Sequence, residues 1–167
     1  VHVCFGVNMD LSKEPQKLIY EMEKPITIAA EEFKWISVIM HCFDKSSAPA
    51  GKSALEVWYA TDYKYWEELI KDRAKYDAEK KRIAEETADA LEKKWPGFKS
   101  KIEVTDVLTP MTYVKYTGNW QGSPDGWYIT TENMMKQQMK RTLPGVDNLY
   151  MVGQWTAPFT GTVIAAQ

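Results

Sequence analysis

The 167-residue chain contains little of what several common kinds of site require. It has two histidines and two cysteines, which leaves little material for histidine-based catalytic triads. His2, Cys4, His41 and Cys42 are zinc-ligand types, but the adjacent His41 and Cys42 would point to opposite faces of a strand. We therefore interpret all four as ordinary sheet residues, disfavour a Cys4–Cys42 bridge, and expect a reducing compartment such as the cytoplasm.

The chain also lacks a charge excess and a long apolar run. A net charge of −2 and a pI near 5.8 argue against a surface that binds nucleic acid or anionic lipid. The longest apolar run, near residues 36–40, is far shorter than the ~20 residues that span a bilayer. We expect no nucleic-acid partner and no transmembrane segment, whereas peripheral membrane contact stays compatible with these features.

The pattern of apolar residues predicts an α+β fold, with a largely antiparallel β-sheet packed against one long helix. β-Branched and alternating segments predict strands at residues 1–7, 18–23, 26–30, 35–43, 54–60 and 101–108. A helix is predicted from Thr61 or Asp62 to Trp95, with a break near residues 74–77. Its apolar stripe comprises Ile83, Ala84, Thr87, Ala88, Leu91 and Trp95. Residues 111–127 are predicted to be loop-rich because their glycines lie among typical turn residues.

Aromatic residues are abundant, with seven tryptophans and nine tyrosines. They cluster at residues 58–66 and 113–128. Core and interface packing explains such a composition, because Tyr and Trp combine apolar bulk with a polar tip. A site for a flat apolar ligand would have the same composition.

Three segments, in this order and spacing, resemble the phytoene dehydrogenase and carotenoid isomerase family. They are DKSSAPAGKSALEV, TPMTYVKYTGNWQGSPDGW and LPGVDNLYMVGQWTAPFTGTVIAAQ. The resemblance covers most of the chain from about Asp44 onward. It implies an FAD-dependent oxidoreductase that acts on polyenes and related hydrophobic molecules. The apolar face of the sheet would line the substrate channel, and catalysis would be hydride transfer to or from the flavin, or flavin-assisted isomerisation.

The resemblance also implies cofactor-binding residues in the last segment, where residues 149–153 are predicted to form a short buried strand followed by a loop and a helix start. The residues that match the flavin-facing positions are Gly153, Gln154, Thr160, Gly161, Thr162 and Val163. A helix N-terminus there would favour negative charge on the reduced flavin. Residues 158–162 keep one glycine of the Pro-Gly-Gly-Gly-like stretch usual in the family, so close backbone contact at Phe159 and Thr160 is not implied.

No strand-GxGxxG-helix unit, which normally holds the dinucleotide pyrophosphate, occurs in the sequence. We therefore expect residues 1–143 to be a fragment of a substrate-binding domain and residues 144–167 a return segment to a nucleotide-binding domain outside the chain. Such a fragment is expected neither to hold FAD tightly nor to catalyse a reaction, and it would self-associate through its terminal strand. No catalytic residue is predicted, although Asp106, Asp125 and Glu132 lie near the relevant loops.

Other interpretations stay open at this level. A non-catalytic binding module for a flat hydrophobic ligand would need the same aromatics and no nucleotide motif. An interaction domain assembled with a separate nucleotide-binding chain is a third hypothesis. Amine- and porphyrinogen-oxidising flavoproteins share a similar terminal motif, so a fragment of one of these is the alternative within the flavoprotein interpretation.

Overall fold

The computed structural model describes residues 1–124, 126, 141–153 and 155. The chain divides into two compact units, Val1–Gly122 and Ser123–Gln167, which are treated separately below. Within the described residues, no helix combines the length and the apolar character needed to cross a membrane.

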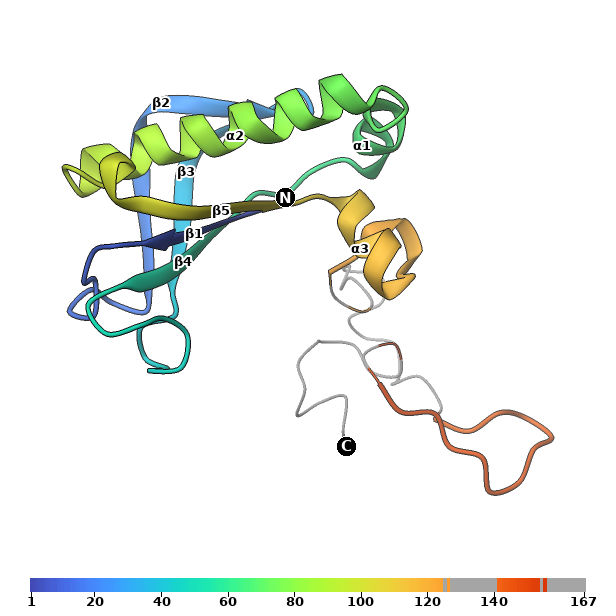
Figure 1. Ribbon diagram of the computed structural model, residues 1–167. Helices are drawn as coiled ribbons and strands as arrows, with labels where there is room; N and C mark the ends of the chain where they lie inside the picture. Colours follow the sequence, from blue (N-terminus) through green and yellow to red (C-terminus); the bar gives the residue numbers. More distant parts are fainter. Residues whose placement is uncertain (125, 127–140, 154, 156–167) are drawn as a thin grey trace. The chain divides into compact units, whose positions relative to one another are not determined.

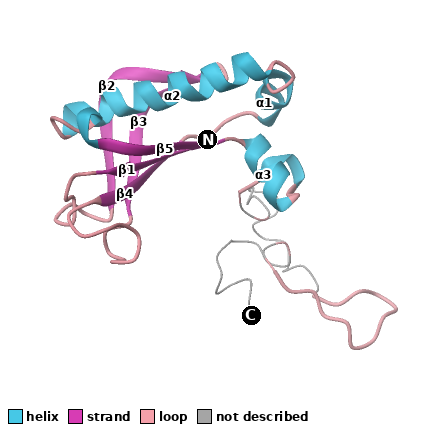
Figure 2. Cartoon of the chain, viewed as in Figure 1, coloured by secondary structure: helices cyan, strands magenta, loops and turns pink. Residues whose placement is uncertain are grey.

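The first unit is built on a five-stranded antiparallel sheet (Figures 1 and 2), which confirms the predicted α+β class. The strand order is β2-β3-β4-β1-β5, and each neighbouring pair is antiparallel. The strands are β1 (His2–Val7), β2 (Lys17–Ile28), β3 (Glu31–Met40), β4 (Ser53–Trp58) and β5 (Ile102–Leu108). The predicted antiparallel pairing of residues 35–43 with residues 54–60 is confirmed by the β3–β4 register.

The strand β2 is continuous where the sequence predicts two strands separated by Lys24 and Pro25. Its register against β3 shifts between Glu21 and Ile26, which marks a bulge or irregularity that includes Pro25. Proline is tolerated at edge strands and bulges because its missing N–H leaves no ladder bond broken there. The proline therefore bends this strand without ending it.

The predicted long helix is divided into α1 (Tyr63–Leu69) and α2 (Arg73–Lys94). The break lies slightly earlier than predicted, because the Asp72 side chain accepts a hydrogen bond from the Lys75 backbone N–H (3.2 Å) and so begins a new helix. The remaining helices of this unit are η1 (Lys99–Lys101), α3 (Pro110–Thr117) and η2 (Trp120–Gly122).

The helix α2 crosses one face of the sheet (Figure 1) and buries its predicted apolar stripe there, which confirms that stripe. We call this the covered face. Its strand residues are almost fully buried and include Val3, Phe5, Ile36, Val38, Leu55, Val57 and Val107. Because side chains alternate along a strand, the residues between them belong to the opposite face.

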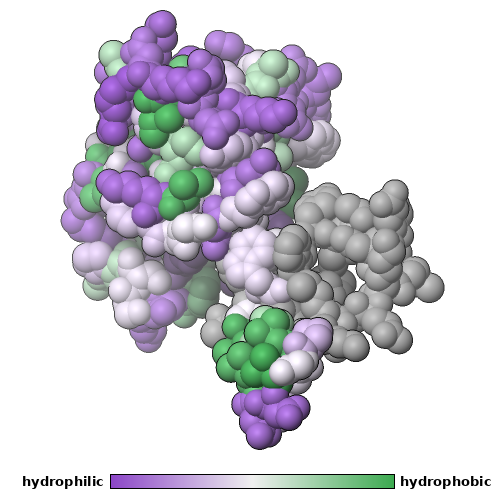
Figure 3. All heavy atoms as spheres, turned by 90° about the vertical axis from the view of Figure 1, so that its right-hand side faces the viewer, coloured by the Kyte–Doolittle hydropathy of each residue, from purple (hydrophilic) through white to green (hydrophobic). Residues whose placement is uncertain are grey.

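In the second unit, residues 141–153 form an irregular hairpin. Thr142 and Tyr150 form an isolated antiparallel bridge, and the Met151 N–H donates to the Arg141 carbonyl (2.7 Å). The buried strand predicted at residues 149–153 is not found, since Tyr150 and Val152 are 69% and 76% exposed. A short strand becomes buried when it pairs with neighbouring strands of a sheet. Within the described residues, the bridge to Thr142 is the only strand-like pairing that residues 149–153 make. Apolar side chains therefore gather on the surface of this hairpin (Figure 3).

Candidate functional site

The sheet face opposite α2, here called the open face, carries no helix in the described part of the first unit (Figure 2). The register of β4, β1 and β5 arranges its residues in rows across the three strands. These rows are Trp58–His2–Leu108, Glu56–Cys4–Asp106 and Ala54–Gly6–Val104. The open face thus mixes aromatic, acidic and very small residues.

Large apolar side chains lie exposed on the open face. Ile19, Trp35, Trp58 and Val104 are 60%, 58%, 43% and 63% exposed. The expectation that the sheet's apolar face lines a channel therefore needs correction, because α2 already covers the more apolar of the two faces. A ligand of this sheet would meet the mixed face, where the apolar positions are separated by polar ones.

The glycine-rich segment after β5 contains a helix, so the predicted loop at residues 111–127 is wrong in its first part. Thr109 and Thr112 form a reciprocal capping box at the start of α3, and Pro110 occupies its first turn. Gly118 ends the helix in the left-handed conformation (φ 67°). A Cβ on Gly122 would lie 2.1 Å from the Pro110 carbonyl oxygen, so this glycine permits the chain to fold back onto the helix start. Turn glycines are indeed present, but they delimit a helix.

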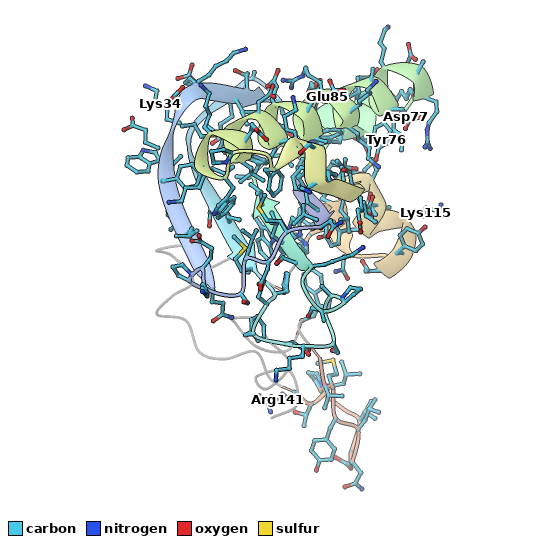
Figure 4. The ribbon with its side chains drawn as sticks, turned by 60° about the vertical axis from the view of Figure 1, so that its left-hand side comes forward. Lys34, Tyr76, Asp77, Glu85, Lys115 and Arg141 are labelled. Atoms are coloured by element: carbon cyan, nitrogen blue, oxygen red, sulfur yellow. The ribbon has the colours of Figure 1, made fainter. Side chains whose placement is uncertain are left out.

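The start of α3 is fixed to the covered side of the molecule by a buried hydrogen bond. The Tyr76 and Thr109 hydroxyl oxygens lie 2.6 Å apart, and both residues are buried. Tyr76 belongs to α2 (Figure 4), and its ring also contacts that of the fully buried Trp66. The Tyr76–Thr109 hydrogen bond thus connects α2, which covers one face of the sheet, with the start of α3, which lies at the end of the open face.

An aromatic cluster occupies the end of the open face next to α3. The rings of His2 and Trp58 stack with centroids 4.0 Å apart and an interplanar angle of 18°. The Tyr113 hydroxyl lies 2.9 Å from His2 Nδ1. Sequence reasoning did not find this cluster, because His2 and Tyr113 are 111 residues apart and only the sheet register brings them together.

The middle row of the open face is polar. Cys4 lies between Glu56 and Asp106 in the register, and burial together with these two carboxylates raises the pKa of its thiol to about 11. Cys4 and Cys42 are both free thiols. His41 Nε2 lies 3.4 Å from a carboxylate oxygen of Glu56. Over the described ranges, no group of three or more His, Cys, Asp or Glu side chains is arranged to hold a metal ion.

The predicted flavin-facing residues are described only at Gly153. Its φ of 122° is in the region that favours glycine, and no atom of the described residues lies within 4 Å of the position that a Cβ would take. Gln154, Thr160, Gly161, Thr162 and Val163 lie outside the described residues, as do Asp125 and Glu132. Asp106 lies on the open face, in the row of Cys4.

Comparison with protein-family models finds no match. Among curated proteins, the chain is 29% identical over 128 residues to a chloroplastic prolycopene isomerase of Daucus carota, and 30% identical over 128 residues to that of Arabidopsis thaliana. It is 27% identical over 131 residues to prolycopene isomerase 1 of an Oncidium hybrid cultivar. Each match covers 74% of this chain. The chain spans about a fifth of the length of the relatives that it matches (20–21%).

Proposed function

Since these relatives confirm that the chain resembles the phytoene dehydrogenase and carotenoid isomerase family, we propose that it is the substrate-facing part of such an oxidoreductase. Its open face would form one wall of a site for an elongated hydrophobic molecule of the polyene class. In this proposal, residues 1–143 bind the substrate, and residues 144–167 lead to the part of the protein that binds FAD.

The observation that carries the proposal is the asymmetry of the sheet. One face is sealed by α2, whereas Ile19, Trp35 and Trp58 stand exposed on the other. Large apolar side chains exposed together on one face can serve as contacts for an apolar partner. Aromatic rings such as Trp58, held by its stack on His2, present flat surfaces suited to a conjugated chain.

Gly153 is the described member of the proposed flavin-facing set. Its φ of 122° is one that glycine adopts readily and larger residues rarely do, so a side chain is disfavoured at this position. FAD would supply the redox chemistry of the substrate carbons when bound. The residues of this chain would orient the polyene along the open face and exclude water from it. Gln154, Thr160, Gly161, Thr162 and Val163 complete the proposed flavin-facing set.

The test is flavin occupancy of the longest natural protein that contains this chain. We expect the purified protein to show a flavin absorption spectrum, and Gly153→Val to reduce the flavin content several-fold. Gly145→Val is the matched control, because Gly145 belongs to the same hairpin, also has a positive φ (79°), and likewise has no described atom near its Cβ position. Two substitutions with equal effects would argue against a flavin contact at Gly153.

The non-catalytic binding module for a flat hydrophobic ligand is the second candidate, because the exposed aromatic rings of the open face suit such a ligand whether or not a flavin is bound. Such a binding module would use the same open face as the oxidoreductase but would bind no flavin. A natural full-length protein that binds a polyene but contains no flavin would favour this candidate over the oxidoreductase. Self-association of the 167-residue chain stays a prediction, measurable by sedimentation.

A further inference from the structure

A groove of about 480 Å³ lies on the open face, beneath the loop that joins β3 and β4. Its apolar lining includes Gly6, Ala54 and Val104 of the sheet and Ala48 and Pro49 of the loop. Small-molecule sites commonly have volumes of roughly 300–1,000 Å³. The groove is therefore large enough for part of an elongated ligand.

The groove exists because two very small residues are neighbours in the sheet. Gly6 pairs with Ala54 on one side and with Val104 on the other. Gly6 has no side chain and Ala54 has only a methyl group, so this part of the row leaves room above the sheet, and Val104, whose Cβ would lie 3.4 Å from a Cβ on Gly6, borders that room. The floor of the groove is thus apolar, and it is formed by the Ala54–Gly6–Val104 row of the sheet.

The next row places a carboxylate at the wall of this groove. Glu56 is among the lining residues, and its side chain is 18% exposed. Within the described part of the chain its polar partner is His41, at 3.4 Å, which is longer than a typical hydrogen bond between charged groups. Cys4 and Ile39, its neighbours across the strands, offer at most a weak S–H donor. Glu56 therefore lines the groove with acceptor capacity to spare. Lys52, Glu103 and Asp106 also line it, and Lys52 is paired with Glu103 at 2.6 Å.

We infer that this groove binds the end of an apolar molecule that bears a hydroxyl group, with the hydroxyl donating to Glu56 and the apolar body on the Gly6–Ala54 floor. The inference rests on the proposed function, because it assumes that the open face binds the substrate, and it specifies the substrate class. A pure hydrocarbon in the groove would take water from the carboxylate without replacing its hydrogen bonds, which is costly. A hydroxyl supplies such a hydrogen bond, because its O–H donates to a carboxylate oxygen.

The inference is tested with two probes that differ by one hydroxyl, farnesol and farnesene, titrated against the 167-residue chain while its tryptophan fluorescence is followed. We expect farnesol to bind about tenfold more tightly than farnesene, the discrimination typical of a hydrogen bond to a charged group. Glu56→Leu should abolish this preference and leave farnesene binding unchanged or tighter. Ala54→Phe should weaken both probes, because the larger ring fills the groove.

The control variant is Glu85→Leu, which changes an exposed glutamate on α2 (Figure 4) and should leave both affinities unchanged. Circular dichroism of each variant verifies that it is folded. If Glu56→Leu does not fold, Glu56→Gln decides instead: its neutral amide is a weaker acceptor than a carboxylate and should reduce the preference for farnesol. Equal binding of the two probes to the unmodified chain, or a farnesol preference that survives Glu56→Leu, would overturn the inference and leave the proposed function standing. Binding of neither probe would overturn substrate binding by the open face and the inference together.

Discussion

The two faces of the same five-stranded sheet have opposite characters. On the covered face, Val3, Val57 and Val38 lie side by side and are fully buried beneath α2. On the open face, one residue further along each strand, Cys4, Glu56 and Ile39 lie side by side and are only partly buried. Because the side-chain period of a strand is two, one sequence buries apolar residues on one face and places partly exposed, mixed residues on the other. The difference shows where substitutions should affect stability and where they should affect ligands.

The largest expected effect is on the covered face. Ile36→Ala should reduce the free energy of unfolding by about 3 kcal/mol, because it leaves a cavity under α2 at a fully buried position. Ile19→Ala is the matched substitution on the open face, where the side chain is 60% exposed, and should cost less than ~0.5 kcal/mol. Urea unfolding of both variants measures the difference. Similar losses would mean that the two faces are packed alike and would break the comparison.

A second prediction concerns the polar row of the open face. With Cys42 replaced by serine, alkylation of Cys4 at pH 8 should be about a hundredfold slower in the folded chain than in urea, because raising the pKa to about 11 lowers the thiolate fraction by about that factor. The folded thiol keeps its proton below pH 11, so the rate should rise steeply as the pH approaches that value. Iodoacetamide labelling followed by mass spectrometry measures both rates. A folded rate equal to the unfolded one would mean that neither burial nor the flanking carboxylates affect Cys4.

The smallest expected effect concerns the hydrogen bond between Tyr76 of α2 and Thr109 at the start of α3. Tyr76→Phe removes the buried hydroxyl that contacts Thr109 and should cost about 1 kcal/mol or somewhat more, because the Thr109 hydroxyl is left without this partner. Tyr63→Phe removes an exposed hydroxyl that donates to Glu67, and should change stability little. Thermal unfolding measures both variants. If Tyr76→Phe is as harmless as its control, the position of α3 does not depend on α2.

Much of the fold could be predicted because it depends on local patterns. Alternation identified β1, β3, β4 and β5, and the stripe from Ile83 to Trp95 identified the buried side of α2. The continuity of β2 through Pro25 could not be predicted, since it depends on β2 being an edge strand. The helix α3 was missed because its glycines are typical of loops, although Thr109, Pro110 and Thr112 form a local helix-start signal and Gly118 ends the helix.

The sequence by itself determined the α+β class, the amphipathic helix and the resemblance to carotenoid isomerases, because composition, periodicity and motif order are properties of the chain. Only the tertiary structure decided which sheet face α2 covers and which face, within the described residues of the first unit, carries no helix. It also decided that His2 meets Trp58 and Tyr113, and that Glu56 borders a groove floored by Gly6 and Ala54. These contacts join residues far apart in the chain, which meet only when the strands pair and α3 packs beside them.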